Sequence, residues 1–204
     1  MLQAQGLAAR RGETTLFSGI RLALKPGTAL IVSGANGSGK TTLLRILAGL
    51  THPAQGTLSW CGVAVQAFDP MLRTRALFIG HVPALKDELT ADENLASLTE
   101  LHGVRASPAA LAAALAVWML SRQRALPARV LSQGQRRRVG LARLSLLART
   151  LWLLDEPATA LDEAGVATLR AALAAHLTGG GMAVIATHQE LSLPAGACTT
   201  LRLA

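Results

Sequence analysis

The stretch of sequence that decides the fold reads G-A-N-G-S-G-K-T, from Gly34 to Thr41. It matches the phosphate-loop pattern G-x-x-x-x-G-K-[ST], in which a tightly wrapped backbone points its N–H groups at the phosphates of a nucleotide. Residues 28–32, T-A-L-I-V, have the composition of a short buried strand, and T-T-L-L-R-I-L-A-G-L after the loop has apolar residues at helical spacing. Strand, loop and helix in this order predict a nucleotide site rather than a structural glycine turn.

The residues of this loop have distinct expected roles. Lys40 would reach the β- and γ-phosphates, the hydroxyl of Thr41 would bind Mg²⁺, and Thr42 would donate to the α-phosphate. The N-terminus of the following helix adds the positive end of its dipole. The expected nucleotide contacts here are Gly34, Ala35, Asn36, Gly37, Ser38, Gly39, Lys40, Thr41 and Thr42.

Two further apolar runs, at 150–154 and 182–186, read as buried strands that end in polar residues. Functional groups at the ends of apolar strands are what an open parallel sheet presents to a ligand. Asp155, after the first run, is expected to hold Mg²⁺ through its hydration shell, and Glu156 to orient or deprotonate the water that attacks the γ-phosphate. The alternative is an acidic pair that caps a turn.

The rest of the chain fits around these strands. Residues 2–30 alternate apolar and polar side chains and predict an antiparallel β edge. The Ala- and Leu-rich middle predicts a helical subdomain, with Pro108 and Pro127 as helix boundaries. The expected fold is α/β, of the phosphate-loop NTPase type. It is one domain over residues 1–204, with a sheet core at about 1–90 and 149–204 and the helical subdomain at about 91–148.

The amino-acid composition limits the range of possible functions. The 204 residues are 50% apolar, enough for a sizeable core, and the formal charge of +8 favours anionic partners: nucleotides, nucleic acid or a membrane surface. With 3% aromatic residues, base-stacking platforms are scarce, which argues against a single-strand nucleic-acid binder. The two cysteines form no metal-binding pattern. The N-terminus does not read as a signal peptide, and the longest uncharged stretch, 106–121, is too short to span a membrane.

The segment L-S-Q-G-Q at 131–135, followed by an Arg-rich helix, resembles the signature of ABC transporter ATP-binding subunits. The resemblance implies that this segment closes over ATP bound to an opposite subunit, and that Ser132, Gly134 and Gln135 contact that nucleotide. The family's usual third residue is Gly, and Gln133 replaces it here. The tripeptide A-L-D resembles the D-loop, which implies that Asp162 faces the partner subunit.

Further residues carry over from the same resemblance. His188 resembles the switch histidine that contacts the γ-phosphate, and His81 stands where the family usually has a glutamine near Mg²⁺ and the attacking water. Arg136 to Arg138 are expected to form a solvated face of the signature helix, with a direct phosphate or lipid contact as the alternative. The expected catalytic residues are therefore Glu156, His188, Lys40 and His81.

The segments I-G-H at 79–81 and A-L-K-D-E-L-T-A-D-E-N-L at 84–95 resemble the cytochrome c biogenesis ATP-binding export family, the haem exporter ATPases. This implies ATP hydrolysis with ATP and Mg²⁺ as cofactors, coupled to transport. The implied partners are a second copy of the chain and an integral membrane permease, contacted around Lys86–Asn94. The implied place is peripheral, at the cytoplasmic face of the bacterial inner membrane. Haem and a periplasmic haem chaperone are indirect partners.

Three alternatives stay open at this point. The chain could be the ATP-binding subunit of another ABC transporter, which shares all the ATPase motifs. A nucleic-acid- or ribosome-associated ABC-type ATPase would suit the positive charge, but the sequence has neither a long heptad run nor a second phosphate loop, so no nucleic-acid partner is expected. A small-molecule phosphotransferase would leave the signature and His188 without a role.

We expect weak base selectivity. Arg11 lies near the place where the family commonly has an aromatic residue that stacks on adenine, and a guanidinium plane stacks on any base. Steady-state hydrolysis of ATP and GTP should therefore proceed at comparable rates. A strong preference for ATP would contradict this role of Arg11.

Overall fold

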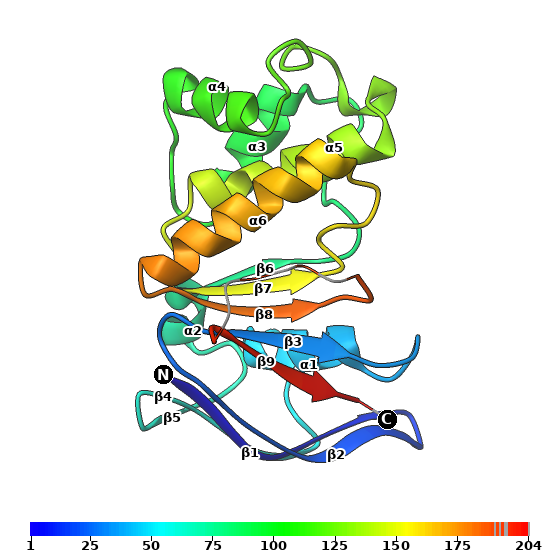
Figure 1. Ribbon diagram of the computed structural model, residues 1–204, viewed down its shortest axis with the longest axis vertical. Coiled ribbons are helices and arrows are strands. Elements are labelled where there is room, and N and C mark those ends of the chain that lie inside the picture. The colour runs from blue at the N-terminus through cyan, green and yellow to red at the C-terminus, as the bar shows by residue number, and fades with distance from the viewer. Residues whose placement is uncertain (190, 192, 194–195, 204) are drawn as a thin grey trace. The chain divides into compact units, whose positions relative to one another are not determined.

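The computed structural model describes residues 1–189, 191, 193 and 196–203 (Figure 1). The chain divides into two compact units: the first comprises residues 1–80, 149–156 and the chain from 173 on, and the second comprises 81–148 and 157–172. The sequence-based bounds, about 1–90 with 149–204 against about 91–148, remain a prediction, as does the assignment of the whole chain to one domain. Among the helices that the structure describes, none combines the length and apolarity needed to cross a membrane.

The first unit contains a parallel sheet of five strands in the order β6-β7-β8-β3-β9. The strands are β6 (Ala76–Ile79), β7 (Leu151–Asp155), β8 (Met182–Ala186), β3 (Ala29–Ser33) and β9 (Cys198–Arg202). Every residue of β7 and β8 is buried, which explains their uninterrupted apolar sequence. The three apolar runs predicted as buried strands are confirmed as β3, β7 and β8.

A second sheet in the same unit is antiparallel, with the order β2-β1-β4-β5. Its strands are β1 (Leu2–Arg11), β2 (Thr14–Leu24), β4 (Gln55–Trp60) and β5 (Val63–Val65). The predicted antiparallel pairing of the N-terminal segment is confirmed, but these strands form a sheet of their own and do not extend the parallel one. In this sheet β1 pairs on one side with β2 and on the other with β4, and the edge strands are β2 and β5.

Helix α1 (Lys40–Leu47) starts directly at the predicted phosphate loop and buries Leu43, Leu44, Ile46 and Leu47. These side chains belong to a core cluster that also contains residues of both sheets, including Leu7, Leu153 and Val184. The short helix α2 (Pro70–Arg75) is capped by Asp69 and leads into β6. The core therefore fixes the start of α1, and with it the loop, against β7 and β8.

The second unit is helical. Its elements are α3 (Ala91–Glu100), α4 (Pro108–Val117), the 3₁₀ turns η1 (Ala128–Val130) and η2 (Ala142–Ser145), α5 (Gln133–Leu141) and the first part of α6 (Glu163–Thr178). Pro108 is the first residue of α4 and Pro127 directly precedes η1, as the sequence predicted. Trp118 is fully buried, and its indole N–H donates to Ser145 Oγ at 3.3 Å.

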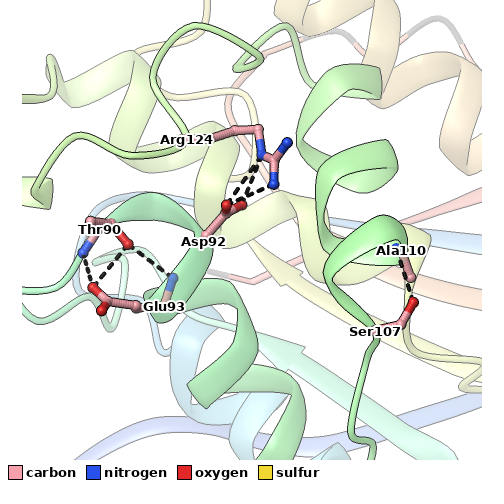
Figure 2. Close-up of polar contacts among 6 residues, drawn as sticks. All are labelled: Thr90, Asp92, Glu93, Ser107, Ala110 and Arg124. Carbon is pink, nitrogen blue, oxygen red and sulfur yellow. Dashed lines mark hydrogen bonds and ion pairs between the residues drawn. The ribbon is translucent and has the colours of Figure 1, made fainter.

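The segment before α3 is rigidly held (Figure 2). Thr90 and Glu93 form a capping box, with Glu93 N to Thr90 Oγ1 at 3.2 Å and Thr90 N to Glu93 Oε2 at 2.8 Å. Asp92 pairs with Arg124, whose Nη2 lies 2.8 Å from Oδ2. The buried side chain of Asn94 accepts from Lys86 N at 2.8 Å and donates to the carbonyl of Lys86 at 3.0 Å and to that of Leu89 at 2.9 Å. Residues 86–94 thus form a defined surface element.

Candidate active site

The predicted phosphate loop lies between β3 and α1, and its backbone requires glycine at two points. A Cβ on Gly34 would lie 2.6 Å from the carbonyl oxygen of Leu203, so no side chain fits there. Gly39, the N-cap residue of α1, has a φ of 94° in the left-handed region, and a Cβ on it would lie 2.9 Å from Phe17. The close approach of neighbouring chain segments fixes the shape of the loop.

Lys40 is 8% exposed although it carries a charge. Its ammonium group donates to two carbonyls of the loop, that of Gly34 at 2.8 Å and that of Ala35 at 3.0 Å. These bonds offset part of the cost of burial. The same loop is closed by a bond from Ser38 N to the Ala35 carbonyl at 3.2 Å, and Thr42 lies in the first turn of α1. The loop therefore holds a positive charge at the N-terminal end of a helix, a setting that suits an anion.

Thr41 and Asp155 meet although 114 residues separate them, because the Thr41 hydroxyl donates to Asp155 Oδ2 at 2.7 Å. Asp155 is 3% exposed and ends β7. A hydroxyl and a carboxylate are the oxygen donors that Mg²⁺ prefers, with substrate phosphates and water completing its shell. The described residues contain no group of three or more His, Cys, Asp or Glu side chains placed to hold a metal ion. The pair thus fits a magnesium ion shared with phosphate.

Glu156, His188 and Asn36 also converge within the first unit. His188 Nε2 lies 3.2 Å from Glu156 Oε1 and 3.2 Å from Asn36 Oδ1. Glu156 has a φ of 48°, a left-handed conformation that is costly for a residue with a side chain. Its N–H donates to the Ala186 carbonyl at 2.8 Å, which holds it beside the end of β8.

In the second unit, Ser132 and Gln135 form two reciprocal hydrogen bonds at the start of α5. Gln135 N donates to Ser132 Oγ at 3.2 Å, and Ser132 N donates to Gln135 Oε1 at 2.9 Å, which forms a capping box. A Cβ on Gly134 would lie 2.6 Å from the carbonyl oxygen of Ala160, so the segment at 160–162 packs against the helix start. The exposed N-terminal end of α5 is thus a rigid structure.

Asp162 joins the same structure. Its Oδ1 accepts from Gly165 N at 2.9 Å, which caps the start of α6, and from the Nη2 of Arg138 on α5. The bond from Arg138, followed by the bond from Gly165, holds the pKa of the Asp162 carboxyl below its ordinary value. Asp162 is therefore an ionised link between the starts of two helices.

A family model described as "ABC transporter" matches residues 17–159 of the chain. The cytochrome c biogenesis ATP-binding export protein CcmA of Cupriavidus necator is 51% identical over 191 residues, which cover 94% of this chain and 84% of that protein. The protein of the same name from Methylococcus capsulatus is 46% identical over 202 residues, 99% of this chain and 97% of its own.

The chain belongs to the ABC transporter family, together with the cytochrome c biogenesis ATP-binding export proteins. Solved structures agree on the fold. A putative ABC transporter ATP-binding protein from Pyrococcus furiosus superposes with a TM-score of 0.83 at 22% identity, over 99% of this chain and 96% of that one. A dimeric ATP-binding cassette, MJ0796, bound to ADP and Pi superposes with a TM-score of 0.78 at 24% identity, over 93% and 88% of the two chains. The predicted α/β fold of an ABC-type phosphate-loop NTPase is confirmed.

In this family context, the predicted site residues fall into two groups, one in each unit. The phosphate loop, Asp155, Glu156 and His188 belong to the first unit, and the ABC signature and Asp162 belong to the second. His81 is the first residue of the second unit; it is exposed, and its carbonyl accepts from Arg137 Nη1 at 3.1 Å. Arg11 is exposed at the end of β1, opposite Thr14. The roles assigned to these residues stay predictions.

The prediction that Arg136 to Arg138 form a solvated face is wrong. Arg136 Nη1 pairs with Asp87 at 2.6 Å, Arg138 binds Asp162, and Arg137 is 3% exposed. Consecutive positions on a helix point in different directions, so three adjacent side chains cannot share one solvated face. Arg137 stands four residues before the fully buried Leu141 on the inner face, and this spacing was the available signal.

Two glycine substitutions in α5 of this ABC family member should have opposite effects on stability. Gly134→Ala would press a methyl group against the Ala160 carbonyl and should lower the free energy of unfolding by about 1–3 kcal/mol. Gly140→Ala is the matched control. Its Cβ would lie 3.8 Å from Pro83, an ordinary contact, and the helix should gain about 0.5–1 kcal/mol. Urea unfolding measures both, and equal stability of the two variants would contradict the tight packing at Gly134.

Proposed function

We propose that the chain is the ATP-hydrolysing subunit of an ABC transporter that serves c-type cytochrome biogenesis, and that it energises a separate membrane-spanning partner. The observation that carries ATP hydrolysis is the convergence of Glu156, His188 and Asn36 in the unit that also holds the phosphate loop and the Thr41–Asp155 pair. These residues supply a base, a γ-phosphate contact and a magnesium site.

The loop binds the triphosphate. Its backbone N–H groups and the N-terminus of α1 face the phosphates, and Lys40 neutralises the β- and γ-phosphate charge. Thr41 and Asp155 would hold Mg²⁺, Asp155 through water. When bound there, the ion would supply Lewis-acid stabilisation of the charge that develops on the phosphate oxygens. Oxygen donors and hydrogen-bond distance between these two side chains support the assignment.

Glu156 is the general base for the attacking water, and His188 contacts the γ-phosphate. The 3.2 Å separation between His188 Nε2 and Glu156 Oε1 allows the imidazole to orient the carboxylate. The bond to Asn36 ties the same ring to the phosphate loop. His81 takes the place of an amide and contacts the water or Mg²⁺ when nucleotide is bound.

A second copy of the chain completes the nucleotide site. The start of α5, with Ser132 as its cap and Gly134 and Gln135 in its first turn, presents the positive end of a helix dipole to a γ-phosphate held by the other copy. The capping box and the Gly134 contact give this surface a fixed shape, which favours binding without reorganisation. We assign Asp162, which accepts from Arg138 on the same helix, to the contact with the partner copy.

We infer the transport role from the relatives of the chain, which are named as cytochrome c biogenesis ATP-binding export proteins. We assign the surface of residues 86–94 to an integral membrane permease. The bonds of Asn94 and the Asp92–Arg124 pair support this, since a rigid surface transmits motion. The place is the cytoplasmic face of the bacterial inner membrane, and the indirect partners are haem and a periplasmic haem chaperone.

Glu156→Gln should abolish turnover and leave nucleotide binding intact. Loss of the carboxylate removes the base, so kcat for ATP should fall by about 10²–10⁴-fold. Binding of a fluorescent ATP analogue should be retained, because Lys40 and the loop are unchanged. Glu13→Gln, on an exposed side chain of the first unit, is the control and should hydrolyse ATP normally. Persistent ATPase activity in Glu156→Gln would disprove the base assignment.

The transport assignment makes a separate prediction. When a tagged chain is expressed in its native host and mildly solubilised, a multi-span membrane protein should co-purify with it. Asp92→Arg should reduce this association, because it replaces the ion pair with Arg124 that holds the 86–94 surface by two like charges, and Glu100→Arg, on an exposed residue at the end of α3, is the control. Co-purification with RNA or ribosomes in place of a membrane protein would support the nucleic-acid alternative.

A further inference from the structure

Arg137 makes an unusual pair of contacts in the middle of α5. Its side chain is buried, and its guanidinium donates through Nε to the carbonyl of Pro157 at 3.2 Å and through Nη1 to the carbonyl of His81 at 3.1 Å. These carbonyls belong to the residues at which the chain enters the second unit, once between Gly80 and His81 and once between Glu156 and Pro157. One side chain therefore joins the backbone at both points of entry.

This arrangement is costly. Burying a guanidinium removes its hydration, and Arg143, which is buried as well, adds repulsion: burial and then the charge of Arg137 lower the pKa of Arg143 to about 10. An apolar side chain of similar volume could pack in α5 without these penalties. Arginine offers instead a planar fork that donates to two carbonyls in fixed geometry. The contacts with the Pro157 and His81 carbonyls make use of this fork.

The contact between Arg137 and the Pro157 carbonyl restrains the backbone next to Glu156, which precedes Pro157 in the chain. Glu156 has a left-handed φ of 48°, and such a conformation persists only where the surrounding structure restrains it. On its N-terminal side, the Glu156 N–H is bonded to the Ala186 carbonyl at 2.8 Å. On its C-terminal side, the next residue has its carbonyl bonded to Arg137.

We propose that Arg137 is a positioning residue for ATP hydrolysis: its fork fixes the backbone of His81 and of Pro157, and through the covalent link from Pro157 to Glu156 it holds the Glu156 side chain in the orientation that a base requires. This inference rests on the function proposed above, which assigns Glu156 as the base.

Two substitutions of Arg137 distinguish the effect of its planar fork from the effects of its charge and of its volume. Arg137→Lys keeps the charge but has no planar fork, and Arg137→Met fills the space without donors. In both, kcat for ATP should fall on the order of 10–100-fold, because small misplacement of catalytic groups has effects of that size. The dissociation constant of a fluorescent ATP analogue should stay at the wild-type value. Arg122→Gln, on an exposed residue of the same unit, is the control and should match the wild type in both measurements.

Amide hydrogen exchange supplies a readout that does not depend on hydrolysis. Peptides that cover residues 79–85 and 155–161 should exchange faster in the Lys and Met variants than in the wild type and in Arg122→Gln, while β3 and β8 stay unchanged. Wild-type kcat in either folded variant, or unchanged exchange in both segments, would overturn the positioning role. If the wild type itself failed to hydrolyse ATP, the proposed function would fail, and the exchange data would still decide whether Arg137 restrains these segments.

Discussion

The hydrogen bond between Thr41 and Asp155 joins the first turn of α1 to the end of β7, two strands away from β3 in the sheet order. It can form only because α1 packs against both β7 and β8. Burial of Leu43, Leu44 and Leu47 directs that packing, and each buried leucine contributes about 1.5–3 kcal/mol, more than the roughly 0.5–1.5 kcal/mol of a hydrogen bond. The apolar face of α1 therefore places the polar site.

The order of the parallel strands decides which chemical groups meet. β7, β8 and β3 are neighbours, and the segments that follow them carry Glu156, His188 and Asn36. Since the carboxyl ends of parallel strands share one edge of a sheet, the strand order alone brings a carboxylate, an imidazole and the phosphate loop to the same edge, where they form their polar contacts. The left-handed backbone at Glu156 turns the chain out of β7 as soon as the strand ends.

The sequence predicts those features whose cause lies in neighbouring residues, and it does not predict those that depend on contacts between distant parts of the chain. The buried strands β3, β7 and β8, the start of α1 and the proline at the start of α4 follow from composition and short-range pattern. In contrast, β9 was not predicted: C-T-T-L-R is mostly exposed and becomes a strand because β3 offers it a free edge. The strands β4 and β6 are short, and their pairing partners lie far along the chain. The Asn36–His188 contact was equally out of reach, because 152 residues separate the two side chains.

The positive charge of the chain is a global property that does not indicate what its individual arginines do. A formal +8 favours several anionic partners equally, and the run of three arginines predicts a solvated face of the helix, with a phosphate or lipid contact as the alternative. In the folded chain, Arg136 and Arg138 bind Asp87 and Asp162, and Arg137 donates to backbone carbonyls inside the second unit. These guanidiniums hold the signature helix to the segments around it, so they shape the surface for which we propose a nucleotide contact instead of forming that surface. In this part of the chain, the charged side chains therefore fix the position of the signature helix through their hydrogen bonds and ion pairs.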